Sequence, residues 1–532
     1  MPDGSAALTP AMTYDVVVIG GGLPGAALAR DCALRGLSVA LFEAEDLGVG
    51  RSGAGALIFG LDHTFFPAPA GDVDDARREL AILRRVAPHF LCPVPLLYLA
   101  PGDGFPDAPS PAGICERLER QRTPSAPEPD RPPVTLGPRA VLGLEPGIVS
   151  APAGALLFEV FLLSAERLCV LSALHARELG AALYTHTEIV DVAQSEDGRT
   201  LAVRARDRIT DRAVSVGARS VVDTTRSSDG LPEIVTIVLE RRISNFAVVV
   251  PVAPRRMLCV VPRQDHTVLT YAGPGSSPGA PDSGGHAAQQ LLDEAARVFP
   301  AVARTRVVSV EHVARPGTSA GTRPLPALHG AGILPLHGST LENHRRLAED
   351  MADRVCVAVG RTAACRSHDT PLPGGERPAR SERFAEQLDL PAPIAEGIVD
   401  RHGERASVVG ARMARVPFER SVVCACGGIL EAEVRHAVRA ELARTVEDVS
   451  RRTGLGRGAC GGMRCAHRAA QLAAQEQGLR PSAAHDMAAR FLVHGLSGRL
   501  ALANGAQLRQ EELSRAALAA SGLWTEPREG AP

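Results

Sequence analysis

The stretch TYDVVVIGGGLPG near the start of the chain places a glycine-rich turn directly after a continuous apolar run. Such a run, bounded by glycines, is typical of a buried parallel strand. Gly20, Gly22 and Gly25 have G-x-G-x-x-G spacing, and alanines and leucines recur at helical spacing from Gly25 to Arg35. A second apolar run, SVALFEA, follows Gly36. The pattern therefore predicts a strand, a helix and a second strand in one βαβ unit.

This glycine spacing has a physical meaning in a turn from strand to helix. The first glycine permits the tight turn, the second lets a pyrophosphate approach the backbone, and the third lets helix and strand pack closely. Free N–H groups at the helix N-terminus then face the phosphates. Glu43 ends the second strand, where a carboxylate accepts the ribose hydroxyls and repels a 2′-phosphate. We expect a bound dinucleotide, against the alternative of a glycine turn without ligand. The motif does not choose between FAD and NAD.

Length and charge limit the class of protein. With 532 residues, 45% of them hydrophobic, the chain is expected to form about two to four globular domains. The formal net charge of −2 gives no excess of positive charge to attract nucleic acid. The sequence contains no apolar run long enough to span a bilayer, and its first residues lack the apolar segment of a signal peptide. These features favour a cytosolic protein, with docking on a membrane partner left open. All 58 basic residues are arginines, so the chain has no lysine ammonium group. Any role that an ammonium group would have must be filled by a different side chain.

The middle of the chain alternates between helix and strand patterns. Residues 164–186 indicate an amphipathic helix leading into a strand, residues 199–225 paired strands, and residues 233–273 a further strand-rich part. The proline-rich segment at 110–137 is expected to be a surface excursion between core elements. Another proline- and glycine-rich passage, PLPGGERPARSERF, indicates a domain boundary near 375–418.

The eleven cysteines fall into two groups. In a large chain of the reducing cytosol they are not expected to form a disulfide framework. Seven are scattered and are interpreted as small hydrophobic core residues: Cys32, Cys92, Cys115, Cys169, Cys259, Cys356 and Cys365. The other four form a C-x-C pair followed by a C-x4-C pair: Cys424, Cys426, Cys460 and Cys465.

Four clustered thiols suit zinc or an iron–sulfur cluster. Structural zinc more often uses two C-x2-C pairs, whereas a C-x-C turn and the wide glycine loop RTGLGRGAC favour a flatter [2Fe-2S] cluster. The spacer ILEAEVRHAVRAELARTVEDVSRR has a helical pattern, and CAHRAAQLAAQ begins another helix at Cys465. We predict a small helical domain around a cluster held by all four cysteines. Zinc and free thiols are the alternatives.

Several stretches outside these motifs are similar to one known family. They are ARDCALRG after the glycine turn, the pair Arg315 and Pro316, LPG at 372–374, RHG at 401–403, and the loop RRTGLGRGAC. Together they resemble the FAD-carrying large subunit of anaerobic glycerol-3-phosphate dehydrogenase, over residues 14–475. The C-terminal part of this range resembles the bacterioferritin-associated ferredoxin type of [2Fe-2S] domain.

The resemblance implies a fold and its domains. It implies a doubly wound α/β domain that binds FAD, an inserted α+β substrate domain and a small helical iron–sulfur domain. The expected parts are a disordered leader at 1–12, a discontinuous FAD-dependent oxidoreductase domain at 13–375 with its substrate part at 96–145 and 230–305, a linker at 376–418, the [2Fe-2S] domain at 419–475, and a helical tail at 476–532.

The resemblance also implies an activity. The family oxidises the C2 hydroxyl of sn-glycerol 3-phosphate to dihydroxyacetone phosphate and passes electrons through a partner subunit to quinone. A chain of this kind is expected in the cytoplasm, with peripheral attachment at the inner face of the cell membrane open and with no nucleic-acid partner.

Several positions depart from the family pattern. Family members carry a segment like L-(I/L)-H-(G/S)-G-x-R-Y near the flavin, where this chain has LIFGLDHT. The substituted positions are Phe59, Leu61, His63 and Thr64, so two presumed substrate contacts are absent. The family's G-G-K-x-x-T-Y-R becomes HGSTLENHR, in which Gly338 and Arg345 remain and Ser339 replaces the lysine. The nucleotide loop N-A-(A/T)-G-x-W becomes DTTRSS at 223–228.

The candidate site residues follow from these motifs. Candidates for catalysis or substrate binding are Arg315, His63 and Arg345, with His312 and His344 as further candidates. Gly338, Ser339 and Thr340 join the glycine turn and Glu43 as cofactor-binding candidates. Three functions remain open: a glycerol-3-phosphate dehydrogenase, a flavoenzyme with the same cofactors acting on a small hydroxy acid or amine, and a non-catalytic electron-relay or assembly subunit. The altered substrate segment is compatible with the second.

Overall fold

The computed structural model describes most of the chain and divides it into two compact units. The first unit consists of Met1–Gly53, Ser164–Leu231 and Pro316–Pro373, and the second of Ala54–Leu163, Pro232–Arg315 and Gly374–Pro532. The described residues are 12–50, 52, 58–66, 70–100, 108–120, 132–149, 152–194, 200–225, 234–263, 265–273, 284–313, 333–377, 380–503 and 505–523. The expected leader at 1–12 falls almost entirely outside them.

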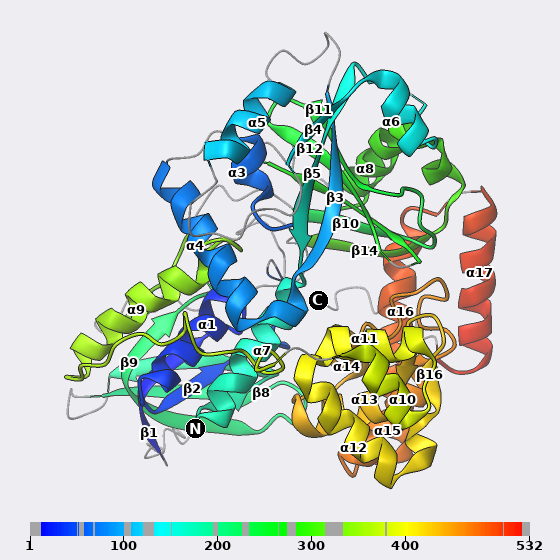
Figure 1. Cartoon of the computed structure of the whole chain (residues 1–532). Helices are drawn as coiled ribbons and strands as arrows, with labels where there is room; N and C mark the ends of the chain where they lie inside the picture. The colour runs from blue at the N-terminus through cyan, green and yellow to red at the C-terminus, as the bar shows by residue number, and fades with distance from the viewer. Residues whose placement is uncertain are drawn as a thin grey trace. The chain divides into compact units, whose positions relative to one another are not determined.

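The first unit is built on a seven-stranded sheet (Figure 1). Its strands are β1 Thr13–Ile19, β2 Val39–Phe42, β6 Ala182–Tyr184, β7 Thr187–Gln194, β8 Leu201–Asp207, β9 Ala213–Asp223 and β15 Ile333–Pro335. Strands β6, β2, β1, β9 and β15 are parallel neighbours in this order. The hairpin of β7 and β8 continues from β9 with antiparallel pairing. The predicted α/β class and the predicted βαβ unit are confirmed.

Three helices of the first unit pack together: α1 Leu23–Leu34, α7 Ala165–Glu178 and α9 His344–Ala358. Helix α1 contacts both α7 and α9, and its many alanines allow this close packing. Strand β1 is buried on both faces, with Val16, Val17 and Val18 fully inaccessible to solvent. Its continuous apolar run is therefore explained by two-sided burial, as expected for a central parallel strand.

The second unit contains an eight-stranded sheet in the order β14-β10-β13-β12-β11-β3-β5-β4. The bounds are β3 Cys92–Ala100, β4 Val134–Leu136, β5 Gly154–Leu162, β10 Ile234–Leu239, β11 Ala247–Ala253, β12 Arg256–Pro262, β13 Thr267–Ala272 and β14 Val307–Val313. All neighbours are antiparallel except β11 and β3. The sheet extends beyond the expected substrate part at 96–145 and 230–305, because β5 and β14 also belong to it.

Both faces of this second sheet are covered by helices. The helices of this part of the unit are α3 Leu61–Phe65, α4 Ala70–Val86, η1 Pro88–Phe90, α5 Pro111–Arg120, α6 Pro138–Leu144, α8 Gly284–Val298 and η2 Pro300–Arg304. Helix α8 places Ala288 and Leu291 in one apolar core. Phe65 and Ile114, from α3 and α5, lie in a second apolar core together with other residues of the sheet.

The rest of the second unit is helical, drawn in yellow to red in Figure 1. Its elements are α10 Ser381–Leu388, α11 Ala392–His402, η3 Gly403–Arg405, α12 Ala406–Arg415, η4 Pro417–Arg420, β16 Val422–Cys424, β17 Ile429–Leu430, α13 Glu431–Ala440, α14 Val446–Thr453, α15 Ala466–Glu476, α16 Pro481–Leu500 and α17 Gly505–Ala520. Among the helices that the structure describes, none combines the length and apolarity needed to cross a bilayer.

Residues 376–418 are expected from the sequence to form a linker, but they fold as three helices. Phe384, Ile398, Val409 and Met413 form an apolar core between these helices. Pro391 stands at the start of α11, and Gly403, with a φ of +57°, stands at its end. The composition that predicts a linker therefore marks tight turns between packed helices.

Within the expected tail at 476–532, the described residues form α16 and α17, but α16 is part of the cysteine domain's core. Ala488, Leu492 and Leu496 of α16 pack with Ala466 and Ala470 of α15 in one buried cluster. Helix α16 also contacts β14 of the second sheet. A boundary near 475 therefore does not separate a tail from the rest of the unit.

The interpretation of the seven scattered cysteines as core residues holds for four of them. Cys32, Cys169, Cys259 and Cys356 are buried, Cys115 and Cys365 are half-buried, and Cys92 is exposed. Cys92 is the first residue of β3, where the strand emerges at the surface.

Candidate functional site

The glycine turn joins β1 to α1 in a conformation that excludes side chains. Gly20 has a φ of +104°, a region that favours glycine. A Cβ atom on Gly25 would lie 1.9 Å from the carbonyl oxygen of Gly20. The backbone N–H of Ala26 donates to the Gly22 carbonyl at 2.9 Å and begins the helical bonding of α1. The third glycine therefore does what the motif predicts, because it lets the helix approach the strand.

Glu43 lies beside this turn, as the sequence predicts. Its carboxylate accepts hydrogen bonds from the backbone N–H of Gly21 at 2.6 Å and of Glu45 at 2.8 Å. Burial raises the pKa of the Glu43 carboxyl above its usual range. The geometry fits the ribose-binding role that the motif predicts for Glu43, and that role stays a prediction.

Neighbouring parallel strands bring further polar groups to the same edge of the sheet. Ile19 at the end of β1 pairs in register with Asp223 at the end of β9. The Asp223 carboxylate accepts from the Thr225 hydroxyl at 2.6 Å, and the Thr224 hydroxyl donates to the Ile19 carbonyl at 2.8 Å. Carboxyl ends of parallel strands are where ligands bind in open α/β sheets. This edge is the candidate nucleotide site.

Sequence reasoning missed two contributors to this edge. Ser52 accepts a hydrogen bond from the backbone N–H of Leu23 at 3.0 Å, in the first turn of α1. Thr224 occupies a position that the sequence indicated only as a departure from the family. Ser52 carries no local signal, because its contact depends on the loop after β2 returning to the glycine turn.

Gly338, Ser339 and Thr340 lie in the loop between β15 and α9. Gly338 has a φ of +75°. The Asn343 side chain closes the loop, because it accepts from the Thr340 N–H at 2.7 Å and donates to the Gly338 carbonyl at 3.2 Å. Since β15 pairs in parallel with β9, this loop leaves the sheet at the same edge as the glycine turn. The role of these three residues in cofactor binding stays a prediction.

The catalytic candidates are described unevenly. Arg315 lies outside the described residues. His63 is half-buried in α3. The Arg345 guanidinium donates to the Glu349 carboxylate at 2.8 Å and to the Ser367 hydroxyl at 3.1 Å. Their functional roles therefore stay predictions.

The segment that departs from the family pattern is well packed in the second unit. Phe59 is buried, and its backbone N–H donates to the Phe161 carbonyl at 2.9 Å. The Thr64 hydroxyl is buried and donates to the Gly60 carbonyl at 2.9 Å. These substituted side chains therefore contribute to packing and to local hydrogen bonding within the segment.

The four clustered cysteines are brought together by two short segments. Cys424 ends β16, and Cys465 caps the N-terminus of α15. The Cys465 thiol is hydrogen-bonded to the sulfurs of Cys424 and Cys460, and Cys460 is hydrogen-bonded to Cys426. The four sulfurs thus form a continuous chain of contacts. The convergence that the sequence predicts is present, and metal binding by these residues stays a prediction.

Backbone amides from the glycine-rich turns surround the sulfurs. Cys424 receives hydrogen bonds from the backbone of Gly456 and Gly427, and Cys460 from that of Arg464 and Gly462. The hydrogen bond with Cys465 and these amides lower the pKa of Cys460, and the pKa of Cys424 is lowered in the same way, whereas the same sulfur–sulfur hydrogen bonds raise the pKa of Cys465. A site that stabilises thiolate in this way suits sulfur ligation of a metal centre.

The cysteine loop leaves no room for larger residues. A Cβ atom on Gly458 would lie 2.3 Å from the Cβ of Cys426. Gly456 and Gly462 have φ values of +82° and +85°, and both lie against the Phe491 ring. Gly458 therefore serves the close approach of the two cysteine segments, and Gly456 and Gly462 let the loop pack against Phe491 of α16.

The chain matches two known families along most of its length. Residues 15–361 match the family of FAD dependent oxidoreductases. Residues 365–484 match the C-terminal domain of alpha-glycerophosphate oxidase. The first match covers the glycine turn, Glu43 and the loop at 338–340, and the second covers all four clustered cysteines.

Relatives and solved structures extend the same comparison. The chain is 27% identical over 535 residues to one of the subunits of anaerobic glycerol-3-phosphate dehydrogenase from Escherichia coli strain K12, covering 94% of this chain and 95% of the relative. It is 26% identical to glycerol-3-phosphate dehydrogenase from Synechocystis, covering 82% and 88%. The structure of glycerol-3-phosphate dehydrogenase from Bacillus halodurans, complexed with FAD, has the same fold, with a TM-score of 0.69, 19% identity and coverage of 92% and 95%.

Proposed function

Since the chain belongs to the family of FAD dependent oxidoreductases, we propose that it oxidises sn-glycerol 3-phosphate to dihydroxyacetone phosphate and passes the electrons through a [2Fe-2S] cluster. The observation that carries this proposal is the similarity to the anaerobic glycerol-3-phosphate dehydrogenase of Escherichia coli over 94% of the chain. The two family matches include the glycine turn and the four converging cysteines, respectively. The proposal therefore rests on the whole chain and not on one motif.

The chain's own residues provide the nucleotide site. The open N-terminus of α1 and the glycine turn would bind the FAD pyrophosphate, because a helix N-terminus stabilises negative charge. Glu43 would accept hydrogen bonds from the ribose hydroxyls. These bonds would replace some of the hydrogen bonds that its carboxylate now accepts from the backbone N–H groups of Gly21 and Glu45. When bound, FAD accepts the hydride from C2 of the substrate, and the cluster accepts electrons singly.

The substrate is a dianion, and its binding needs positive charge. Without lysine, the chain must supply that charge from arginine or histidine. We assign the main contact to Arg315, whose guanidinium can donate two parallel hydrogen bonds to phosphate. His63 and Arg345 are secondary candidates, and Arg345 also holds the start of α9 through Glu349 and Ser367.

Cys424, Cys426, Cys460 and Cys465 are the proposed cluster ligands. Two thiolates for each iron complete a [2Fe-2S] centre. The backbone N–H groups of Gly427, Gly456 and Gly462 would stabilise the negative charge of the sulfurs, since hydrogen bonds to sulfur tune such centres. A single zinc held by the same four sulfurs is the alternative.

An electron-accepting partner follows from this arrangement. The Escherichia coli relative is named as one subunit of its enzyme, and on that basis we propose a partner subunit that passes electrons to quinone. The proposed location is the cytoplasm, with attachment at the inner face of the cell membrane through that partner.

A second function is favoured by the substituted segment at 59–64. His63 and Thr64 stand where the family has arginine and tyrosine, and Phe59 stands in place of the family's histidine. Loss of two charge-assisted or polar substrate contacts weakens binding of a phosphate ester by about 100-fold or more. The same cofactors would then act on a small hydroxy acid or an amine.

One spectroscopic experiment tests both functions. The purified protein, kept free of oxygen, is loaded with FAD, and its visible spectrum is recorded before and after addition of substrate. Bleaching of the flavin by sn-glycerol 3-phosphate, and not by glycerol, is the expected result. Bleaching by lactate or glycine alone would favour the second function, and no bleaching by any substrate would contradict both.

A further inference from the structure

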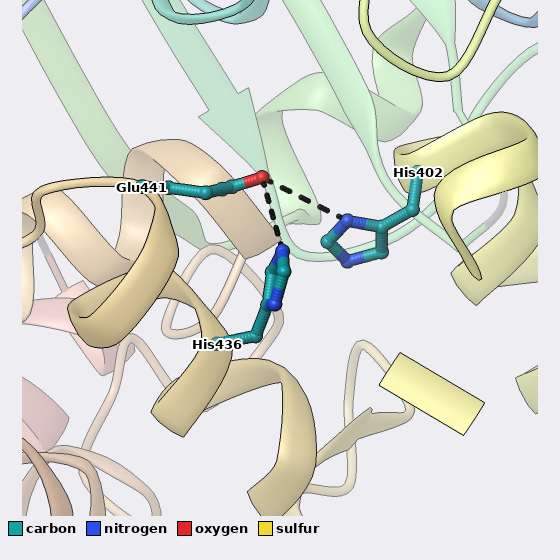
Figure 2. Close-up of side chains that lie close together, drawn as sticks. All are labelled: His402, His436 and Glu441. Atoms are coloured by element: carbon teal, nitrogen blue, oxygen red, sulfur yellow. Dashed lines mark ion pairs between the residues drawn. The ribbon is translucent and has the colours of Figure 1, made fainter. Parts of the chain in front are cut away.

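Two histidines and a glutamate converge in the helical part of the second unit; His402 precedes the two cysteine pairs in sequence, and His436 and Glu441 lie between them. Figure 2 shows His402 at the end of α11, with His436 of α13 and Glu441 directly after it. His402 Nδ1 and His436 Nε2 each lie 3.8 Å from Glu441 Oε1. The two imidazole rings are 5.4 Å apart and nearly perpendicular.

His402 is buried with an unsatisfied nitrogen. The residue is 3% exposed, and among the described residues its Nε2 makes no hydrogen bond of good geometry. That nitrogen lies 3.4 Å from Glu433 Oε1, and Glu433 is fully buried and paired with Arg401 at 2.7 Å. A buried imidazole without a good hydrogen bond is costly, so a ligand that organises the ring would stabilise it.

The spacing of the three side chains is unsuited to hydrogen bonding and suited to coordination. One ligand atom from each of the three residues lies within 4.8 Å of the other two. At 3.8 Å, the histidine nitrogens are too far from the Glu441 carboxylate for a hydrogen bond. A cation between them, bound at about 2.0–2.2 Å to each ligand, would need only small side-chain movements.

We propose that His402, His436 and Glu441 bind one divalent transition-metal cation of the zinc class. Two imidazoles and one carboxylate form an established zinc ligand set, which leaves a fourth position for water. The two helices that carry these ligands lie far apart in sequence, so the cation would join α11 to α13. This site is independent of the four cysteines and of the proposed oxidoreductase function.

Surrounding groups complete the expected environment of such a site. A histidine that binds metal through Nδ1 usually donates its other N–H to a carboxylate, and Glu433 is correctly placed for this at His402. The side chain of His436 is 16% exposed, which leaves a route for the cation to enter. Glu433 acts here as a positioning residue, because it would contact His402 and not the cation.

Zinc binding to the full-length protein tests the proposal. The FAD-loaded chain is stripped with a chelator that leaves the cysteine centre intact, incubated with zinc and freed of excess metal, and the zinc retained per chain is measured. The comparison includes His436→Gln, Glu441→Gln and, as a matched control, His494→Gln, since His494 is an exposed histidine of α16. The wild type and the control should each retain one zinc more than the two ligand variants.

X-ray absorption at the zinc edge of the wild type identifies the ligands without any variant. Nitrogen and oxygen neighbours at about 2.0–2.1 Å, with no sulfur, are expected for this site. Equal zinc retention in all four proteins would overturn the proposal. Zinc surrounded only by sulfur would overturn it as well, because the metal would then belong to the cysteine site.

Discussion

Gly25 lies where the first turn of α1 approaches the end of β1, and only a hydrogen atom fits there. A Cβ atom would lie 1.9 Å from the Gly20 carbonyl oxygen and 2.8 Å from the Thr224 hydroxyl. The first obstacle is backbone of the turn itself and the second follows the end of β9, so the strain cannot be relieved by moving one flexible side chain. The identity of one residue therefore determines the geometry of the candidate phosphate site.

Replacement of this glycine should separate cofactor binding from general folding. Gly25→Ala is expected to lower the free energy of unfolding by about 2 kcal/mol, as overpacking does, and to remove most of the bound FAD. FAD content after gel filtration, read from the visible spectrum, is the measurement. Gly143→Ala is the control, because a Cβ on that exposed glycine meets nothing within 4 Å. Normal FAD content in Gly25→Ala would refute the assigned role of the turn.

His344 is a buried titratable residue at the start of α9. Its ring is 3% exposed, and Nδ1 donates to the Leu341 carbonyl at 2.7 Å, which fixes the neutral form with the proton on Nδ1. Burial lowers the pKa of His344 from 6.5 to about 4, and the positive charges of Arg345 and Arg30 contribute to this shift. The folded chain therefore resists protonation that the unfolded chain accepts.

This difference makes stability depend on pH in a defined direction. Between about pH 6.5 and pH 4, the unfolded state binds one proton more than the folded state, so stability falls as the pH falls. As the pH falls from about 7 to about 4, the free energy of unfolding should decrease by about 3 kcal/mol more in the wild type than in His344→Asn. The reason is that asparagine keeps a hydrogen-bond donor but does not titrate. Urea unfolding at several pH values measures this. His494→Asn serves as the exposed control, and equal pH dependence in wild type and His344→Asn would contradict the prediction.

Arg315 is the residue on which the proposed substrate contact depends most. If Arg315 makes the proposed bidentate phosphate contact, Arg315→Ala should raise KM for sn-glycerol 3-phosphate about 10- to 100-fold with FAD still bound. Arg304→Ala, at an exposed arginine of η2, should leave KM unchanged. Steady-state kinetics with a dye acceptor measures both variants. Unchanged KM in Arg315→Ala would exclude the role.

At the scale of elements, β14 is an edge strand that helical residues protect. The Gln507 side chain donates a hydrogen bond to the Val307 carbonyl at 3.2 Å and accepts one from the Val307 backbone N–H at 3.3 Å. Arg499 of α16 donates to the Val308 carbonyl at 3.1 Å. These contacts satisfy backbone groups that would otherwise be open to pairing with another chain. The last two helices therefore stabilise the sheet to which they attach.

Glu511 holds this attachment together. Its carboxylate is fully buried and lies 3.3 Å from both Arg306 and Arg499. Glu511→Gln leaves the buried Arg499 guanidinium without its counter-charge, while Arg306 keeps its ion pair with Glu240, and should lower the free energy of unfolding by about 3 kcal/mol. Glu512→Gln, the exposed neighbour, should change it by less than about 0.5 kcal/mol. Urea midpoints provide the comparison, and similar midpoints for the two variants would contradict the assignment.

Elements with local cues could be predicted from the sequence, and those that depend on distant contacts could not. The βαβ unit and the helix beginning at Cys465 rest on apolar periodicity and glycine spacing, and both are present. The pattern of the cysteine spacer predicts continuous helix, yet the chain breaks between α13 and α14, where Leu442 has a φ of +62°. The start of α14 has a recognisable signal in the sequence, a capping box formed by Thr445 and Asp448. The interpretation of the spacer did not use this signal.

The candidate sites show the same division. The glycine turn and the cysteine cluster each lie within short sequence motifs, so their residues could be identified. Ser52 and the group formed by His402, His436 and Glu441 come together only through loop closure and helix packing. No spacing in the sequence indicates such contacts, since α11 and α13 are joined by intervening helices and turns.

At the scale of the whole molecule, the two kinds of chemistry lie in different units. The glycine turn and Glu43 belong to the first unit, and the four cysteines belong to the second. Each site is completed by residues of its own unit, as the contacts of Gly25 and of Cys460 show. Damage to one site should therefore leave the other intact.

Cys460→Ser tests this separation and the proposed electron route together. Cys460 contacts both Cys465 and Cys426, so its loss should prevent assembly of the cluster and abolish the paramagnetic resonance signal of the reduced protein. FAD binding and flavin reduction by substrate should persist, because the first unit is unchanged. Electron transfer to the physiological acceptor should then fail, while transfer to a dye that reacts with the flavin continues. Cys115→Ser, at a half-buried cysteine of α5, should behave as the wild type. If Cys460→Ser kept full transfer to the physiological acceptor, the four cysteines would hold a structural centre, and electrons would leave the flavin by another route.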